Sequence, residues 1–259
     1  MSAVSWLSVA PVKGLALVHP DAIELERTGV ATNRRFYLID RGGRQYGLLR
    51  GGTLVQIRPE YESADDRLVL RFPDGSTVDG RIELGEAVAA RIGSREVDGR
   101  LVEGPWSEAI SAHAGRELRL VKTDLPGDAV DRRRGQVTLV SDASVEELAR
   151  QGGREDVDAR RFRMLVGVAD CDPHEEDEWV GRTLQVGEAV VRLRGHVGRC
   201  AITTQNPETG VPDFDTLRAI KAYRGLRDGE LDFGVYGEVV EPGRVRVGDP
   251  VEPLERGLF

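Results

Sequence analysis

Short alternating segments separated by turn residues dominate the first hundred residues and constrain the fold most strongly. Each segment alternates in part between apolar and polar side chains, a pattern typical of half-buried strands. The segments are VSWLSVA, RRFYLID, TLVQIRP, DRLVLRF, STVDGRIEL and SREVDGRLV. Residues 41–44 (RGGR) interrupt the pattern, and Asp74-Gly75 is expected at the tip of a hairpin formed by LVLRFPDGSTVDG. This half of the chain is therefore predicted to be a small all-β barrel or sandwich.

The second half mixes short helices with strands. Residues 104–115 and 213–225 are each expected to form a helix that ends at a glycine, and a capping box of Ser144 and Glu147 is expected to begin another. Strand patterns occur at residues 117–123, 137–141, 161–169, 182–187, 189–195 and 231–251. The predicted fold is mainly β with a few short helices. We expect an N-terminal β-barrel domain at residues 1–103 and a second β-barrel domain at residues 104–259.

The charge and the cysteine count limit the classes of function. The net charge of −8 argues against a nucleic-acid-binding surface, and the basic residues include only three lysines, Lys13, Lys122 and Lys221. The acidic run DCDPHEEDEW is expected to be a solvated surface, with docking of a basic redox partner as the alternative. Cys171 and Cys200 do not make a disulfide framework for 259 residues. The N-terminus lacks a secretion signal, and no apolar run approaches the roughly 20 residues that span a bilayer. We therefore expect a cytoplasmic protein without membrane contact.

Cys200 stands in the segment GHVGRCAITTQNPETG and is the residue whose chemistry most needs an explanation. The sequence has no phosphate-binding loop, dinucleotide fingerprint, H-E-x-x-H or G-x-S-x-G motif, so common nucleotide and hydrolase chemistry lack support. Cys200 is either an inert buried thiol, a zinc ligand with Cys171, His174 and His196, or the single soft thiolate ligand of a metal held by a cofactor. Arg199 beside it favours the thiolate form.

Several segments occur in an order that closely resembles a known family. They are APVKG (10–14), NRRFYLID (33–40), LVSDASVEEL (139–148), RRFRMLVGV (160–168), EEDEWVGRTLQVG (175–187), RCAITTQNPETG (199–210) and FGVYGEVVEPGRVRVGDPV (233–251). The series is similar to proteins that join an N-terminal MOSC-type β-barrel domain to a MOSC domain, including the mitochondrial amidoxime-reducing component and its bacterial relatives. The pattern R-C-x-x-T-T-x-x-P-x-T-G is the most specific part of the resemblance.

The resemblance implies a molybdenum–molybdopterin cofactor in the cleft between the two halves. It makes Cys200 the metal ligand and the catalytic residue, and it assigns cofactor contacts to Lys13, Gly14, Arg34, Arg163, Arg199, Cys200 and Tyr236. Asn33 replaces the usual Asp before Arg34. Two further departures limit the comparison. Met164-Leu165 follow RFR where the family often has Pro-Asn, and the loop DAVDRRRGQ replaces a shorter, less basic stretch. Residues 132–134 (RRR) of this loop either clamp a phosphate or nucleotide extension or form a solvated run, which we favour.

The function implied by the resemblance is the reduction of N-hydroxylated compounds such as hydroxylamines and amidoximes. Electrons are expected from a separate reductase, either a flavoprotein or a protein of the ferredoxin or cytochrome b5 type. One alternative is a carrier protein, with Cys200 holding a persulfide or with the protein passing molybdenum cofactor to other enzymes. Another is a cofactor-free binding module with an inert Cys200. The sequence also leaves pyridoxal phosphate binding open.

Overall fold

The structure is a computed structural model that describes residues 1–125 and 135–254. Its largest sheet is barrel-like and is here called the large barrel. Within these residues the sheet contains, in order across it, β1 (Ala3–Leu7), β12 (Val166–Ala169), β11 (Val137–Ser141), β15 (Asp232–Glu241), β14 (Ala189–Gly198), β13 (Thr183–Val186) and β17 (Val251–Pro253). Its edges nearly meet, because the Val4 amide donates to the Asp249 carbonyl and the Gly248 amide donates to the Val4 carbonyl, each at 2.8 Å. Buried valines and leucines fill its interior.

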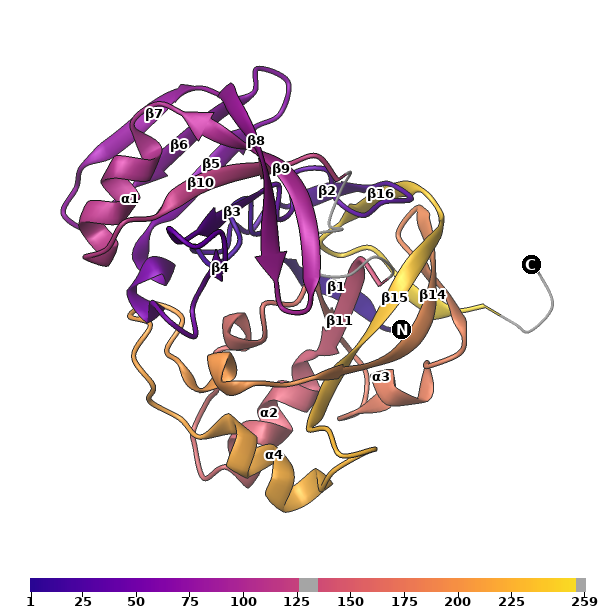
Figure 1. Cartoon of the computed structure of the whole chain (residues 1–259). Helices are drawn as coiled ribbons and strands as arrows, with labels where there is room; N and C mark the ends of the chain where they lie inside the picture. The colour runs from indigo at the N-terminus through magenta and orange to yellow at the C-terminus, as the bar shows by residue number, and fades with distance from the viewer. Residues whose placement is uncertain (126–134, 255–259) are drawn as a thin grey trace.

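A smaller sheet, here called the small barrel, lies beside the large barrel (Figure 1). In order across it the strands are β4 (Gln45–Tyr46), β3 (Phe36–Ile39), β10 (Arg119–Thr123), β9 (Arg95–Glu103) and β8 (Glu83–Ile92). A further sheet of β5 (Arg58–Glu62), β6 (Arg67–Arg71) and β7 (Thr77–Arg81) packs with it, together with α1 (Trp106–Ala114). The Trp106 indole donates to the Leu68 carbonyl at 3.1 Å and so fixes α1 to this sheet.

Strands from each half of the sequence pair with strands from the other half. From the first half, β1 pairs with β12 of the large barrel and β2 (Ala22–Leu25) pairs with β16 (Gly243–Arg246). From the second half, β10 pairs with β3 and β9 of the small barrel. A cut after residue 103 therefore separates paired strands. The division into domains at residues 1–103 and 104–259 stays a prediction.

Helices cover the outside of the large barrel at the end away from α1 (Figure 1). They are α2 (Asp142–Gln151), α3 (Glu175–Glu178) and α4 (Thr216–Arg224), with the 3-10 helices η2 (Ala159–Phe162) and η3 (Ala201–Thr204) nearby. The 3-10 helix η1 (Gly52–Gln56) instead packs against α1 in the core of the small barrel. The two predicted glycine ends are confirmed, since Gly115 follows α1 and Gly225 follows α4. No helix among the described residues is long and apolar enough to cross a membrane.

The capping box predicted at Ser144 and Glu147 is wrong. The side chain of Ser141 accepts the Ser144 amide at 3.0 Å, so Ser141 caps α2 and the helix begins before Ser144. The Ser144 hydroxyl donates instead to the Glu176 carboxylate at 2.7 Å. Ser144 therefore contacts a residue 32 positions away, and Ser141 is the local cap of the helix.

One of the predicted strands of the first half also differs. The segment TLVQIRP forms η1, and β5 begins only at Arg58, because the adjacent Leu54 and Val55 are both buried and so do not alternate. The hairpin predicted around Asp74-Gly75 is confirmed by the antiparallel pairing of β6 with β7. The mainly β fold with a few short helices is confirmed as well.

The acidic run DCDPHEEDEW is not a fully solvated surface. Glu176 is completely buried, and it accepts hydrogen bonds from the Ser144 hydroxyl and from the Ser141 amide. Burial raises the pKa of the Glu176 carboxyl even though these bonds oppose the shift. Asp177 pairs with Arg224 at 2.5 Å. The expected solvated loop is thus wrong for these two carboxylates.

Candidate functional site

A cavity of about 420 Å³ lies between the two barrels. It is lined by every predicted cofactor residue except Tyr236, namely Lys13, Gly14, Arg34, Arg163, Arg199 and Cys200. The other lining residues include the apolar Leu48, Leu49, Met164 and Ile202. None of the described residues that line the cavity is acidic. The cavity is therefore suited to a ligand that carries negative charge and an apolar or polarisable part.

Cys200 occupies the turn between a strand and a short helix. Strand β14 ends at Gly198, and Cys200 is the N-cap of η3 in an extended conformation. Its carbonyl accepts hydrogen bonds from the amide and the hydroxyl of Thr203, at 3.1 and 3.0 Å. These bonds fix the backbone and leave the side chain exposed in the cavity. The interpretation of Cys200 as an inert buried thiol is therefore wrong.

The zinc interpretation is also wrong. The ring of His174 lies 3.2 Å from the Tyr223 hydroxyl, and His196 faces Asp177 and Arg227. Across residues 1–125 and 135–254, no group of three or more His, Cys, Asp or Glu side chains is placed to hold a metal ion. Cys171 is half-buried, and burial raises the pKa of its thiol to about 12. A thiol of that kind is a poor metal ligand at neutral pH.

His174 gives the stability of the fold a predicted dependence on pH. Burial, with the nearby Arg224 guanidinium, lowers the pKa of His174 from 6.5 to about 4. The folded state therefore keeps His174 neutral where the unfolded chain binds a proton. Its contribution to stability is complete above pH 6.5 and is lost as the pH falls toward 4. We expect acidification from pH 7 to 4.5 to cost about 1–2 kcal/mol through this group, reduced for its partial exposure.

The measurement is urea unfolding at both pH values for the wild type and for His174→Asn. Asparagine tolerates the left-handed backbone at this position, where φ is 64°. The variant should lose less stability on acidification than the wild type. Equal losses in the two proteins would show that other groups carry the dependence.

Two arginines of the cavity stand in backbone conformations that are uncommon for residues other than glycine. Arg34 has a φ of 51° and Arg163 a φ of 50°. They are linked, because an Arg34 Nη2 donates to the Arg163 carbonyl at 3.3 Å, and Arg163 Nη2 donates to the Leu15 carbonyl at 2.8 Å. Asn33 is buried and its Oδ1 accepts the Ala10 amide at 2.9 Å, which holds the turn before Arg34. Strained residues of this kind concentrate at binding sites.

Lys13 and Gly14 form the turn on the other wall of the cavity. The Lys13 amide donates to the Phe36 carbonyl at 2.7 Å and so attaches the turn to β3. Gly14 has a φ of 92°, and a Cβ atom there would lie 3.5 Å from the Gly47 Cα. Glycine permits this backbone conformation where the two loops meet. Lys13 is therefore held at the cavity by a rigid turn.

Arg199 points its guanidinium into the protein. Its Nε donates to the Phe233 carbonyl at 2.8 Å, its Nη1 donates to the Phe162 carbonyl at 3.0 Å, and its Nη2 lies 2.9 Å from the Met164 sulfur. The guanidinium carbon lies 5.1 Å from the centre of the Phe162 ring. These contacts join the end of β14 to η2 and β15. They indicate that Arg199 positions the Cys200 loop, while its contact with a cofactor stays a prediction.

Tyr236 is not among the residues that line the cavity. Its ring lies behind Gly135, where an added Cβ atom would come within 2.6 Å of the ring, and also packs on Gly195. Gly135 itself lines the cavity, so Tyr236 supports that wall. Its contact with a cofactor stays a prediction. The arginines at 132–134 lie outside the described residues.

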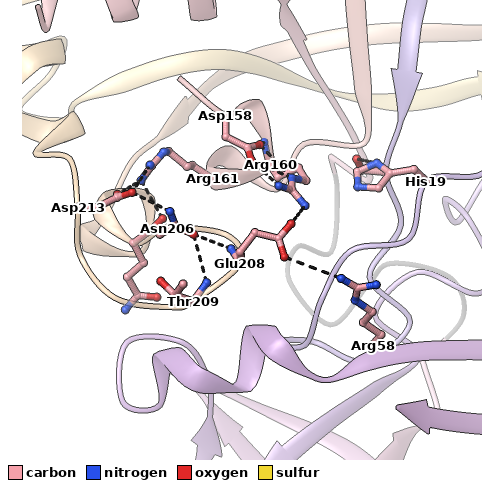
Figure 2. A network of polar contacts seen from close by, with 11 residues as sticks. His19, Arg58, Asp158, Arg160, Arg161, Asn206, Glu208, Thr209 and Asp213 are labelled. Carbon is pink, nitrogen blue, oxygen red and sulfur yellow. Dashed lines mark hydrogen bonds and ion pairs between the residues drawn. The ribbon is translucent and has the colours of Figure 1, made fainter. Parts of the chain in front are cut away.

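Arg161 is a cavity residue that the sequence did not single out. Its side chain is only 6% exposed and pairs with Asp213 at 2.7 Å (Figure 2). Its Nη1 also donates to the Gln205 carbonyl at 2.9 Å. Its Nε is buried and has no hydrogen-bond partner among the described residues. A buried donor without a partner is costly, and a ligand in the cavity can satisfy it. The partner Asp213 lies 52 positions away, so no local signal marked Arg161.

The loop after η3, residues 205–210, contacts the small barrel beside the cavity. Gln205 donates to the Leu48 carbonyl at 3.0 Å. Further along, the backbones of Gly210 and Gly52 meet so closely that a Cβ atom on Gly210 would lie 2.0 Å from the Gly52 oxygen. The segment from Cys200 to Gly210 therefore ends at the backbone contact with Gly52, which only glycine allows.

Two family descriptions match the sequence. The MOSC domain matches residues 111–252, and the MOSC N-terminal beta barrel domain matches residues 1–104. Mitochondrial amidoxime reducing component 2 of Bos taurus is 28% identical over 283 residues, which covers 96% of this chain and 82% of that protein. Mitochondrial amidoxime-reducing component 1 of Mus musculus is 34% identical over 122 residues, which covers 44% of this chain and 35% of that protein.

Other similar proteins extend this comparison. Molybdenum cofactor sulfurase of Drosophila grimshawi is 27% identical over 272 residues, which covers 96% of this chain and 34% of that protein. The crystal structure of the YUAD protein from Bacillus subtilis is 13% identical, with a TM-score of 0.45, and covers 98% of this chain and 96% of that chain. The matched region thus spans about a third of the sulfurase and nearly all of the bacterial protein.

Proposed function

Since the chain belongs to the MOSC domain family and carries the MOSC N-terminal beta barrel, we propose that it is a molybdenum-cofactor-dependent oxidoreductase. Its substrates are N-hydroxylated compounds such as hydroxylamines and amidoximes, and its electrons come from a separate reductase of the flavoprotein, ferredoxin or cytochrome b5 type. The observation that carries the proposal is the exposed thiol of Cys200 in a cavity whose described lining residues include no acidic side chain. A thiolate is the soft ligand that such a metal accepts.

The residues present fit a molybdenum–molybdopterin group. The volume of about 420 Å³ lies within the range of small-molecule sites. Lys13 and Arg34 supply positive charge for the phosphate of the group. The buried Arg161 Nε supplies a hydrogen-bond donor that otherwise lacks a partner among the described residues. Cys200 supplies one protein ligand, which suffices where the pterin supplies the others.

In this proposal the protein binds and orients the cofactor and the substrate, and the cofactor performs the redox chemistry. The bound group supplies the two-electron chemistry that cleaves an N–O bond. The overall reaction of a hydroxylamine consumes two electrons and two protons and yields an amine and water. Cys200, the N-cap residue of η3, would hold the metal through its thiolate. Leu48, Leu49 and Ile202 give the cavity an apolar wall, which favours substrates with an apolar body next to the N–O group.

The test is turnover by full-length protein made in a host that synthesises molybdenum cofactor. Reduced methyl viologen should be oxidised anaerobically when a hydroxylamine or an amidoxime is added. Protein made in a strain unable to synthesise the cofactor should fold and show a rate at least about 100-fold lower, because no side chain replaces the metal. Equal rates in the two preparations would exclude the proposed chemistry.

The exposure of Cys200 also favours a second candidate, a carrier of persulfide sulfur or of molybdenum cofactor. An exposed thiol can be reached by an acceptor protein, and the relative from Drosophila grimshawi is named molybdenum cofactor sulfurase. Cyanide treatment of the purified protein separates the candidates. Release of about one sulfur per chain without bound molybdenum would favour the carrier, since a persulfide transfers its outer sulfur to a nucleophile.

A further inference from the structure

A second cavity lies at the seam between the two barrels, separate from the cavity of Cys200. Its volume is about 740 Å³, and it is lined by Arg58, Arg71, Arg160 and Arg163. Among the described residues that line it, Glu208 is the one carboxylate. The two cavities share one lining residue, Arg163, and otherwise have different linings.

Two of these arginines are held side by side on neighbouring strands. Arg58 of β5 is the register partner of Arg71 of β6, and Arg71 is in turn the partner of Thr77 of β7. Cβ atoms of such partners lie about 5 Å apart, and like charges placed directly opposite each other destabilise a sheet. Arg71 has one carboxylate partner, Glu60, at 3.0 Å. An anion shared by Arg58 and Arg71 would offset the repulsion between them.

The Glu208 carboxylate lies between two of the arginines that line the cavity. Its Oε1 accepts from Arg160 Nη1 at 2.5 Å and its Oε2 lies 4.0 Å from Arg58 Nη2, so one carboxylate reaches between two guanidinium groups (Figure 2). The Asn206 Oδ1 accepts the Glu208 amide at 2.8 Å and positions this side chain from the loop that follows η3. Asp158 also pairs with Arg160 at 2.6 Å and Glu60 pairs with Arg71, so Glu208 is a third carboxylate beside the four arginines of the cavity.

We propose that this second cavity binds a phosphate monoester or a diphosphate. A dianionic phosphoryl group carries more charge than Glu208 and offers three oxygens to forked guanidinium donors. It can therefore displace the Glu208 carboxylate from Arg58, whose contact is long. The volume leaves room for an organic body attached to the phosphate. Cys200 and Lys13 do not line this cavity, whereas Arg163, a predicted cofactor contact, lines both cavities.

The experiment is isothermal titration of the full-length protein with inorganic pyrophosphate at constant ionic strength. Arg58→Gln and Arg71→Gln should each weaken binding about fivefold or more, because each removes a charged donor. Glu208→Gln should strengthen binding about threefold, because it removes the competing carboxylate. Arg41→Gln is the matched control, since Arg41 is an exposed arginine paired with one carboxylate, Glu117, and lines neither cavity.

Lys13→Gln separates the two cavities, because Lys13 lines only the first of them. Affinity that survives this substitution and falls in Arg58→Gln and Arg71→Gln supports the proposal. Affinity lost in Lys13→Gln and unchanged in the other two variants would place the anion at the first cavity and overturn it. Wild-type protein that shows no saturable binding at millimolar pyrophosphate would overturn it too. None of these readouts requires molybdenum.

Discussion

Replacement of Cys200 by serine is expected to lower bound molybdenum from about one atom per chain to below about a tenth, because a hydroxyl is a far weaker ligand for a soft metal than a thiolate. The substitution changes one atom of a side chain that is exposed in the cavity, so the fold should be unaffected. The measurement is elemental analysis of molybdenum and zinc together, on protein made in a host that synthesises molybdenum cofactor.

Cys171→Ser is the matched control for this experiment. Cys171 is the other cysteine of the chain, it is half-buried, and it does not line the cavity. Its substitution should leave the molybdenum content unchanged. If both variants retained the metal, the cofactor would be held without a protein thiolate, and the assignment of Cys200 would be wrong. If folded wild-type protein held neither metal, labile sulfur on Cys200 would become the next measurement.

Local patterns predicted the elements whose signals lie within a few residues. The hairpin at Asp74-Gly75 and the glycine ends of α1 and α4 depend on turn and cap geometry, and both kinds of prediction are confirmed. The start of α2 depends on a distant partner. Because Glu176 is buried and needs donors, it takes the Ser144 hydroxyl, and Ser141 caps the helix. The burial of a carboxyl group 32 positions away thus determines which serine caps the helix.

The alternation of apolar and polar residues could not predict which strands pair with each other. The alternation at residues 4–10 predicted a strand, but it did not show that β1 pairs with β12 rather than with its neighbours in the sequence. Apolar side chains of β1 fill the large barrel together with those of β12, and many strands present the same pattern. Only the packed structure selects among such pairings.

The resemblance to the MOSC family identified more residues of the candidate site than the residue patterns alone did. It added Lys13, Arg34 and Arg163 to Cys200, which the residues alone had singled out, and the structure places all four around one cavity. Their roles toward a cofactor stay predictions. Arg161 was missed because a buried arginine in an arginine-rich chain has no distinctive sequence signal. Its identity as a site residue rests on its burial and on the Nε atom without a partner.

Substitution of Gly210 by alanine is expected to destabilise the fold by about 3 kcal/mol, the largest effect we predict on stability. Gly210 has a φ of 73°, and an added Cβ atom would lie 2.0 Å from the Gly52 oxygen, so both backbone strain and a clash arise. The clash is with backbone, which a rotamer change cannot relieve. The measurement is the free energy of unfolding in urea at 25 °C.

Two control variants separate the causes of this loss. Gly225 has the same φ of 73° with nothing within 4 Å of an added Cβ atom, so Gly225→Ala carries the strain alone and should cost about 1 kcal/mol. A Cβ atom on Gly52 would lie 2.1 Å from the Gly210 oxygen, so Gly52→Ala carries the clash and should cost about 2 kcal/mol. Because the loop with Gly210 begins at Cys200, the two clashing variants should also bind less molybdenum. If Gly210→Ala lost no more stability than Gly225→Ala, the seam would tolerate the extra atom, and the close contact would not position the site.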